Sequence, residues 1–271
     1  MKIMGTICQN GKLFSWIKKE IEIKNSIKKG SKGQGVRRVQ EWLNLYSMGV
    51  VIDGDFGVVT KKVVSQFQER CGLPTSGTVN KETFRFLVSP LLHILQPINP
   101  GGHDLPALVL AYAKAHLAQH PREAGGDNCG PWVRLYMKGN EGSAWLWCAG
   151  FLTFILQQAT ETLEIPMPIE GSISCDTLAA QAKEAGIFIR ESDLKNGSIN
   201  IEDLSEASVF LVRRTSNHWY HAGLVTKFHK DSFETIEGNT NDEGIEKFGY
   251  EVCARTRGYT DIDFIVLEKI I

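Results

Sequence analysis

The sequence lacks the features that define several common protein classes. Its six cysteines are scattered and include no Cys-x-x-Cys pair, which argues against a zinc-binding pattern and against a dense disulfide framework. No stretch of the sequence approaches the ~18 consecutive apolar residues that span a bilayer. The formal net charge of −1 gives no general electrostatic reason to expect a nucleic acid as partner. The sequence therefore predicts a globular protein that binds neither nucleic acid nor membrane.

The amino terminus also lacks a secretory signal. Residues 1–19 contain neither a long apolar core nor a small-residue cleavage site. We therefore expect synthesis in the cytoplasm without a signal peptide. Residues 1–29, in which lysines alternate with apolar residues, are assigned as an N-terminal extension; a solvated face explains this pattern at least as well as a binding patch does, and their role stays open.

The chain is long enough for two domains. It has 271 residues, of which 42% are hydrophobic and 23% charged, as in ordinary globular proteins. Residues 89–104 contain Pro90, Pro97, Pro100 and a glycine pair, which predicts an extended linker. The expected domains are residues 30–88 and residues 105–271, each folding separately.

Residues 30–88 have a helical pattern. Apolar residues recur at three- and four-residue spacing in residues 36–43 and again in residues 63–67. A glycine-rich turn, Asp53-Gly54-Asp55-Phe56-Gly57, separates these stretches, and residues 76–83 repeat the turn more loosely before a third apolar stretch. The pattern predicts a small all-α three-helix bundle with two related turn-then-helix elements.

This half resembles the type-1 peptidoglycan-binding family. The matching motifs are Gly33-x-x-Val36-x-x-x-Gln40-x-x-Leu43, Asp53-Gly54-x-Phe56-Gly57-x-x-Thr60, Phe67-Gln68, Gly72-Leu73 and Ser76-Gly77. The resemblance implies a groove that binds peptidoglycan stem peptides and nearby glycan, with Asp53, Phe56, Phe67 and Gln68 as candidate binding residues. Ser76 stands where the family often has Asp, and Phe84 where it often has Trp. The same turns and apolar residues would also build a bundle that binds nothing.

The second half predicts an α+β domain. A helical stretch covers residues 105–120, a glycine-rich loop leads to a short helix near residues 132–136, and a strongly apolar helix follows Cys148. After Gly197 the apolar runs are short and rich in β-branched or aromatic residues, which is typical of strands, at 208–212, 222–228, 233–236 and 264–267. Helices followed by an antiparallel sheet indicate this class of fold.

Three short pieces of this half carry candidate catalytic chemistry: Trp147-Cys148-Ala149-Gly150, His221-Ala222-Gly223 and Glu237-Gly238-Asn239. Acyl transfer by a thiol requires a thiolate, an imidazole partner and a third polar group that orients the imidazole. Cys148 opens a helix, where the positive end of the dipole favours the thiolate. His221 and the acidic or amide residue are expected on adjacent strands.

Each of these roles has a competitor. Cys148 alone is equally consistent with a buried cysteine that packs beside aromatic residues, and Cys129 and Cys175 are alternative nucleophiles. His218 competes with His221 as the base. Glu237 and Asn239 both suit the orienting role, and Glu237 is favoured because a carboxylate stabilises an imidazolium more than an amide does.

The three pieces together resemble the CHAP family of cysteine amidases and peptidases, papain-like relatives of the NlpC-type hydrolases. The matching residues are Trp147-Cys148-Ala149-x-Phe151, His221-Ala222-Gly223, Ile236-Glu237-Gly238-Asn239-Thr240 and the loop Gly126-Asp127-Asn128-x-Gly130-Pro131. The resemblance implies Cys148 as nucleophile, His221 as base, and Glu237 and Asn239 as the residues that complete the site. Trp147 and Trp219 are candidate substrate-binding residues, although core packing is the expected role of at least one of these rings. No metal-ligand run such as His-Glu-x-x-His occurs, and no cofactor is expected.

The two resemblances together predict a peptidoglycan hydrolase with its own wall-binding domain. Because no signal peptide is evident, the chain resembles a phage endolysin released through a holin, or an antibacterial effector delivered by a secretion system and matched by an immunity protein. Two alternatives remain open: a non-catalytic wall-binding protein with a degenerate papain-like domain, and a cysteine protease or acyltransferase that acts on protein. The choice between an N-acetylmuramoyl-L-alanine amidase and a stem-peptide endopeptidase also stays open.

Overall fold

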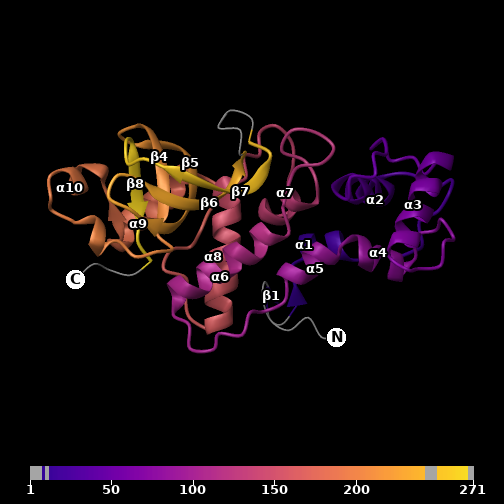
Figure 1. Cartoon of the computed structure of the whole chain (residues 1–271), viewed down its shortest axis with the longest axis horizontal. Helices are drawn as coiled ribbons and strands as arrows, with labels where there is room; N and C mark the ends of the chain where they lie inside the picture. Colours follow the sequence, from indigo (N-terminus) through magenta and orange to yellow (C-terminus); the bar gives the residue numbers. More distant parts are fainter. Residues whose placement is uncertain (1–7, 10–11, 242–248, 268–271) are drawn as a thin grey trace. The chain divides into compact units, whose positions relative to one another are not determined.

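The computed structural model describes residues 8–9, 12–241 and 249–267. These residues fall into two compact units, each formed from segments that are separate in the sequence (Figure 1). Unit 1 contains Gln96–Pro121 and the described part of Leu146–Ile271, and unit 2 contains Cys8–Leu95 and Arg122–Trp145. Within the described part of the chain, no helix combines the length and apolar character needed to cross a membrane.

Unit 2 is helical, as the sequence predicts for the N-terminal region. Its elements are the hairpin strands β1 (Cys8–Gln9) and β2 (Lys12–Leu13) and the helices α1 (Ser15–Ile21), α2 (Gln34–Leu45), α3 (Val58–Arg70), α4 (Lys81–Leu87), α5 (Ser89–Ile94) and α7 (Pro131–Tyr136). The spacing of Val36, Val39 and Leu43 brings these side chains to one face of α2, where all three are buried.

Two equivalent turns organise α2, α3 and α4. The amide oxygen of Gln40 on α2 accepts a hydrogen bond from the backbone N–H of Gly54 at 2.8 Å, and that of Gln68 on α3 accepts one from Gly77 at 2.9 Å. Each glutamine also donates to the carbonyl of the residue that follows its glycine, at 3.1 and 2.9 Å. Both glycines have positive φ, 72° and 66°, which only glycine adopts without strain. The two predicted turn-then-helix elements are thus built by the same contacts.

The expected linker at residues 89–104 begins with a helix. Residues 89–94 form α5, in which Leu91 and Ile94 are buried. Pro90 stands in the first turn of α5, where a missing N–H costs no helical hydrogen bond. The prediction of an extended linker is therefore wrong for these residues, because the proline begins a helix whose apolar side chains belong to the core of unit 2.

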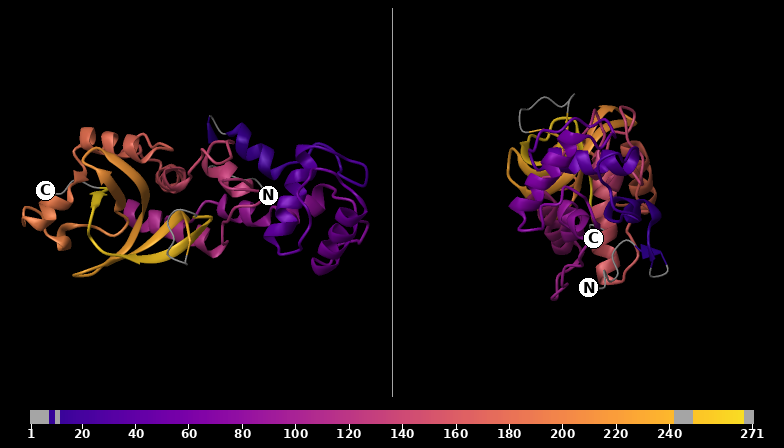
Figure 2. Two further views of the ribbon diagram at one scale, coloured as in Figure 1. Left: turned by 90° about the horizontal axis from the view of Figure 1, so that it is seen from above. Right: turned by 90° about the vertical axis from the view of Figure 1, so that its right-hand side faces the viewer.

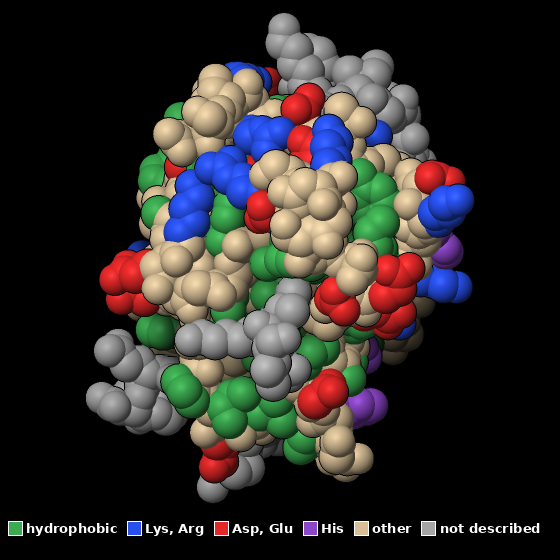
Figure 3. Space-filling model, turned by 90° about the vertical axis from the view of Figure 1, so that its left-hand side faces the viewer, with side chains coloured by type: hydrophobic (Ala, Val, Ile, Leu, Met, Phe, Trp, Pro, Cys, Tyr) green, Lys and Arg blue, Asp and Glu red, His purple; other side chains and the backbone are tan. Residues whose placement is uncertain are grey.

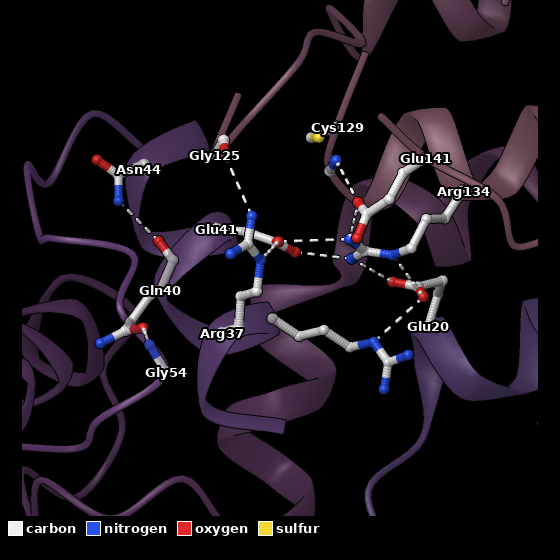
Figure 4. Close-up of polar contacts among 12 residues, drawn as sticks. Glu20, Arg37, Gln40, Glu41, Asn44, Gly54, Gly125, Cys129, Arg134 and Glu141 are labelled. Atoms are coloured by element: carbon white, nitrogen blue, oxygen red, sulfur yellow. Dashed lines mark hydrogen bonds and ion pairs between the residues drawn. The ribbon is translucent and has the colours of Figure 1, made fainter. Parts of the chain in front are cut away.

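Residues 122–145 belong to unit 2 and not, as expected, to the domain that follows the linker. The ring of Trp132 on α7 lies 6.1 Å from that of Trp42 on α2, between centroids. Arg134, also on α7, bonds to the buried carboxylates of Glu20 and Glu41 at 2.9 and 2.7 Å (Figure 4). These charges need a counter-ion in the interior, and the segment at 122–145 supplies it.

Unit 1 is an α+β unit, as the sequence predicts. Its helices are α6 (Leu105–Ala118), α8 (Cys148–Leu163), α9 (Cys175–Ala185), α10 (Glu191–Lys195) and the 3₁₀ turn η1 (Ile201–Asp203). Its strands are β3 (Phe188–Ile189), β4 (Val209–Thr215), β5 (His218–Phe228), β6 (Phe233–Thr240), β7 (Glu251–Arg257) and β8 (Ile262–Ile265). The sheet is antiparallel throughout, in the order β3-β8-β4-β5-β6-β7.

The arrangement of unit 1 brings α8 to the middle of the sheet. Helices α6 and α8 pack on each other, and α8 and α9 both contact β5 (Figure 1). Two further views show the strong twist of the sheet (Figure 2). The first residue of α8 is thereby placed beside the central strands β5 and β6, which carry the predicted histidine and acidic residue.

Candidate active site

Cys148 is the first residue of α8. Trp147 is the N-cap and makes no side-chain capping bond, so the first-turn N–H groups of α8 have no acceptor within the helix. These N–H groups and the helix dipole favour negative charge at the Cys148 sulfur. Only 4% of Cys148 is exposed. The predicted helix start and the predicted position of the thiol both agree with the structure.

His221 and Glu237 meet across the adjacent strands β5 and β6. The imidazole Nε2 of His221 lies 2.8 Å from the Oε2 of Glu237. The carboxylate of Glu237 is completely buried and also accepts hydrogen bonds from Arg257, at 2.6 and 2.7 Å, and from the hydroxyl of Thr235 at 2.7 Å. Burial opposes ionisation, but the bonds from Arg257 and His221 outweigh it and hold the pKa of Glu237 well below its usual range.

The surroundings of Cys148 and His221 favour the thiolate and the imidazolium, respectively. Burial lowers the pKa of His221, but hydrogen bonds to Cys148 and Glu237 outweigh burial and raise that pKa to about 9. A hydrogen bond from Cys175, with further contributions from His221 and the backbone of Ala222, overcomes burial and lowers the pKa of Cys148 well below its usual value. Because Glu237 occupies Nε2, Nδ1 is the ring nitrogen left for the thiolate.

Two glycines permit this close packing. A Cβ atom at Gly223 would overlap the ring of Phe210 and lie 2.8 Å from the Cγ of Glu237. One at Gly238 would lie 2.9 Å from the Cβ of Phe151. The sequence predicts that the small residues after His221 leave room for another element, and the elements that use this room are β4 and β6.

Asn239 has a different role from Glu237. Its side-chain oxygen accepts a hydrogen bond from the backbone N–H of Trp147 at 2.8 Å, and its amide nitrogen donates to the carbonyl of Gly249 at 2.8 Å. Asn239 adopts a left-handed backbone with φ of 55°, which asparagine tolerates better than most residues. Asn239 therefore holds the backbone immediately before Cys148, whereas Glu237 holds the imidazole.

Two of the three competing residues make contacts away from Cys148, and the third lies beside it. Nδ1 of His218 lies 2.9 Å from a carboxylate oxygen of Asp176. Cys129 lies in unit 2, where its thiol donates to the carbonyl of Asp127 at 3.3 Å. Cys175, in contrast, lies beside the candidate nucleophile, with 3.8 Å between its Sγ and that of Cys148. Sequence reasoning missed this contact; the only local signal is that Cys175 follows a serine suited to begin a helix.

The two tryptophans proposed to bind substrate are core residues. Trp147 is 0% exposed and Trp219 is 3% exposed. The indole N–H of Trp219 donates to the buried carboxylate of Asp263 at 2.9 Å, and the Nζ of Lys183 lies 4.4 Å from its ring centroid. Lys and Arg side chains form a band among acidic ones on the face of unit 1 shown in Figure 3. Both rings face the interior, which favours core packing over contact with substrate.

Three of the four candidate binding residues of the N-terminal half are also buried. Phe56 and Phe67 belong to the core of unit 2, and Gln68 is engaged by the turn at Gly77. Asp53 is exposed at the surface and accepts hydrogen bonds from Gln40 and from the backbone N–H at residue 55, both at 2.8 Å. Phe56, Phe67 and Gln68 thus build the domain and leave Asp53 as the candidate that a ligand can reach. Sequence reasoning missed the exposed apolar side chains near this turn, which are Val51, Val58 and Val59.

Comparison with known proteins identifies the first of the two resemblances. Residues 32–87 match the family described as "Putative peptidoglycan binding domain". Residues 32–87 are a type-1 peptidoglycan-binding domain. This peptidoglycan-binding domain contains α2, α3 and α4 and lies wholly in unit 2.

A solved structure is similar to part of the chain. The crystal structure of the SleB N-terminal domain is 31% identical in sequence, and the similarity covers 25% of this chain and 93% of that one with a TM-score of 0.24. A search of curated proteins finds no match. The identification thus concerns the peptidoglycan-binding domain and leaves the chemistry of unit 1 to be argued from its own residues.

Proposed function

We propose that unit 1 is a cysteine hydrolase that cleaves an amide bond of peptidoglycan, and that the peptidoglycan-binding domain targets it to the cell wall. The observation that carries the proposal is the arrangement of Cys148, His221 and Glu237. A thiol at a helix N-terminus pairs with an imidazole, and a buried carboxylate holds the other ring nitrogen at 2.8 Å. This constellation, on a helix that precedes an antiparallel sheet, supports a papain-like enzyme of the CHAP type.

Acylation follows from the charged state of the pair. The thiolate of Cys148 attacks the carbonyl carbon of the scissile amide, and the negative charge that develops on the carbonyl oxygen is stabilised by first-turn N–H groups of α8. The imidazolium of His221 then donates its Nδ1 proton to the leaving amine. Glu237 keeps the ring in position and stabilises its positive charge during this step.

Deacylation uses the same residues, with His221 as a base instead of an acid. The imidazole of His221, now neutral, removes a proton from a water molecule that attacks the thioester carbonyl. Collapse of the second tetrahedral intermediate releases the acid and restores the thiolate–imidazolium pair. Arg257 keeps Glu237 ionised throughout, because its guanidinium donates to both carboxylate oxygens.

The peptidoglycan-binding domain adds affinity without entering the chemistry. Covalent linkage holds the hydrolase near its substrate after each release, which can raise apparent affinity by ~10²-fold or more. A wall-binding domain fits action on the cell wall, and delivery through a holin or a secretion system stays a prediction from the sequence.

Hydrolysis of purified sacculi tests the proposal. The full chain is expected to lower the turbidity of sacculi, and Cys148→Ala to abolish this activity by several orders of magnitude, since no acyl-enzyme can form. Cys129→Ser, which removes a thiol of unit 2, serves as the matched control with activity retained. Mass spectrometry of the released fragments would distinguish a MurNAc–L-alanine amidase from a stem-peptide endopeptidase. Full activity of a folded Cys148→Ala variant, or no fragments from the unaltered chain, would contradict the proposal.

A further inference from the structure

A second thiol lies at the start of a second helix and points at the candidate nucleophile. Cys175 is the first residue of α9, with Ser174 as a hydrogen-bonding N-cap. The Sγ atoms of Cys148 and Cys175 are 3.8 Å apart, whereas a disulfide bond is about 2.05 Å long. The two sulfur atoms therefore need to approach by less than about 2 Å for a disulfide bond to form.

The starts of the two helices are held in place by polar contacts. The hydroxyl of Thr153 on α8 donates to the carbonyl of Ser172 at 2.6 Å and accepts from the N–H of the same residue at 2.9 Å. Asp176, the second residue of α9, accepts a hydrogen bond from the backbone N–H of Trp219 at 2.6 Å and faces His218 at 2.9 Å. The loop before α9 is thus fixed to α8, and α9 is fixed to β5. The sulfur–sulfur contact is a product of this framework.

The surroundings of the two thiols shift their pKa values in opposite directions. The surroundings of Cys148 favour its thiolate, while the neighbouring thiolate and burial raise the pKa of Cys175 well above its usual value. A thiolate is the form that reacts with a hydroperoxide, and a nearby thiol is the group that condenses with the sulfenic acid formed. Among the other described cysteines, Cys71 and Cys129 have pKa values that burial raises.

We propose that Cys148 and Cys175 form a reversible redox site, in which a hydroperoxide oxidises Cys148 and Cys175 resolves the product as a disulfide. The thiolate of Cys148 attacks the distal oxygen of the hydroperoxide, the O–O bond breaks, and after protonation an alcohol or water leaves with Cys148 as its sulfenic acid. The sulfur of Cys175 then attacks the sulfenic sulfur, and water leaves as the S–S bond forms. One equivalent of hydroperoxide is reduced as two thiols are oxidised.

The disulfide occupies the sulfur that the proposed hydrolase uses as its nucleophile. Oxidation would therefore silence hydrolysis, and reduction by a dithiol would restore both thiols. The disulfide would also protect Cys148 from further oxidation to the sulfinic and sulfonic acids, which a dithiol does not reduce. The redox chemistry depends on the two thiols and their surroundings and not on the hydrolysis of any amide.

Intact-mass measurement of the full chain tests the redox site. A modest excess of hydrogen peroxide is expected to lower the mass by about 2 Da, and dithiothreitol to reverse the change. Peptide mapping without reduction should find residue 148 linked to residue 175. Cys129→Ser, which leaves the pair intact, should behave as the unaltered chain. Cys175→Ser should instead gain oxygen at Cys148, at least tenfold more sulfinic and sulfonic acid than the unaltered chain.

Other outcomes would overturn the redox site. They are accumulation of oxygen adducts on Cys148 at equal rates with and without Cys175, or a disulfide to some other cysteine. Cys175→Ala, compared with Cys175→Ser by circular dichroism, keeps the test valid if one substitution perturbs the fold. If the disulfide forms but sacculi are not hydrolysed, the redox site stands and the proposed function fails. The opposite result leaves the hydrolase without this redox site.

Discussion

Each unit contains an arginine that bonds to a buried carboxylate, and the two clusters differ in the groups at which they end. In unit 2, Arg134 bonds to Glu20, Glu41 and Glu141, at 2.9, 2.7 and 2.6 Å (Figure 4). Glu41 also accepts from Arg37 on the same helix at 3.1 Å. The groups in this cluster are carboxylates and guanidinium groups, and the guanidinium groups donate hydrogen bonds to the carboxylates. The cluster joins α1, α2 and α7 and presents no nucleophile.

In unit 1 the contact between an arginine and a carboxylate begins a longer series of interacting side chains. Arg257 bonds to Glu237, Glu237 bonds to His221, and His221 faces the thiol of Cys148. The series ends at an imidazole that can gain or lose a proton and at a sulfur that can form a covalent bond. The ion pairs of Arg134 therefore stabilise the fold of unit 2, whereas the ion pair of Arg257 supports candidate chemistry in unit 1. The difference lies in the imidazole and the thiol at which the series in unit 1 ends.

Removing the imidazole should affect activity nearly as much as removing the thiol of Cys148. His221→Ala is expected to lower hydrolysis of sacculi by ~10³-fold or more, because the thiolate loses its partner and the leaving amine its proton donor. His218→Ala is the matched control, since this histidine faces Asp176, and its effect should be mild. Initial rates at equal folded fraction would be compared. The reverse ranking would reassign the base to His218.

Removing the arginine of unit 2 should affect stability and not chemistry. Arg134→Met leaves the carboxylates of Glu20 and Glu41 buried without their shared counter-ion, and the loss of such a partner costs about 3–5 kcal/mol. Denaturant unfolding should show this loss. Glu141→Gln, which removes a half-exposed partner of the same arginine, should cost much less. Equal stability of Arg134→Met and the unaltered chain would show that the cluster contributes little.

The smallest of these effects is a shift in pH dependence. The imidazolium of His221 is needed for protonation of the leaving amine, so activity should be present below its pKa of about 9 and lost above it. Since the pKa of His221 is raised by folding, the stability that its charge contributes is likewise full below its unfolded value of about 6.5 and lost as the pH rises through about 9.

Two neighbouring substitutions would assign that basic limb. Glu237→Gln removes the carboxylate at Nε2 and should move the limb down by about 1–3 pH units. Asn239→Ala should leave the limb in place, since Asn239 contacts the backbone of Trp147 and not the ring. Rate profiles of kcat/KM against pH would show the difference. An unmoved limb in Glu237→Gln would mean that another group sets the charge of His221.

The predictable part of the molecule is the part encoded locally. Short sequence patterns predict the start of α8 at Cys148 and the strands that carry His221 and Glu237. The spacing of apolar residues predicts the helices of residues 30–88. The contact between Glu237 and His221 follows because β5 and β6 are consecutive strands.

The unpredicted part depends on contacts between distant residues. Cys175 contacts Cys148 because two helices pack together. Arg257 bonds to Glu237 from β7, a strand that the sequence pattern did not predict because charged residues interrupt its apolar ones. The sequence also left open whether Trp147 and Trp219 face the site or the core, because a tryptophan beside a catalytic motif looks the same in sequence in both cases. The assignment of residues 122–145 to unit 2 depends on charges that lie about a hundred positions away.

The placement of Arg134 has a consequence for synthesis on the ribosome. Glu41 and Arg134 are 93 residues apart in the sequence, and translation proceeds at about 5–20 residues per second. Glu41 on α2 therefore emerges about 5–20 s before its counter-ion. During that interval Glu41 of the nascent domain, like Glu20 on the preceding helix α1, lacks Arg134, and the cluster is completed only when α7 leaves the exit tunnel.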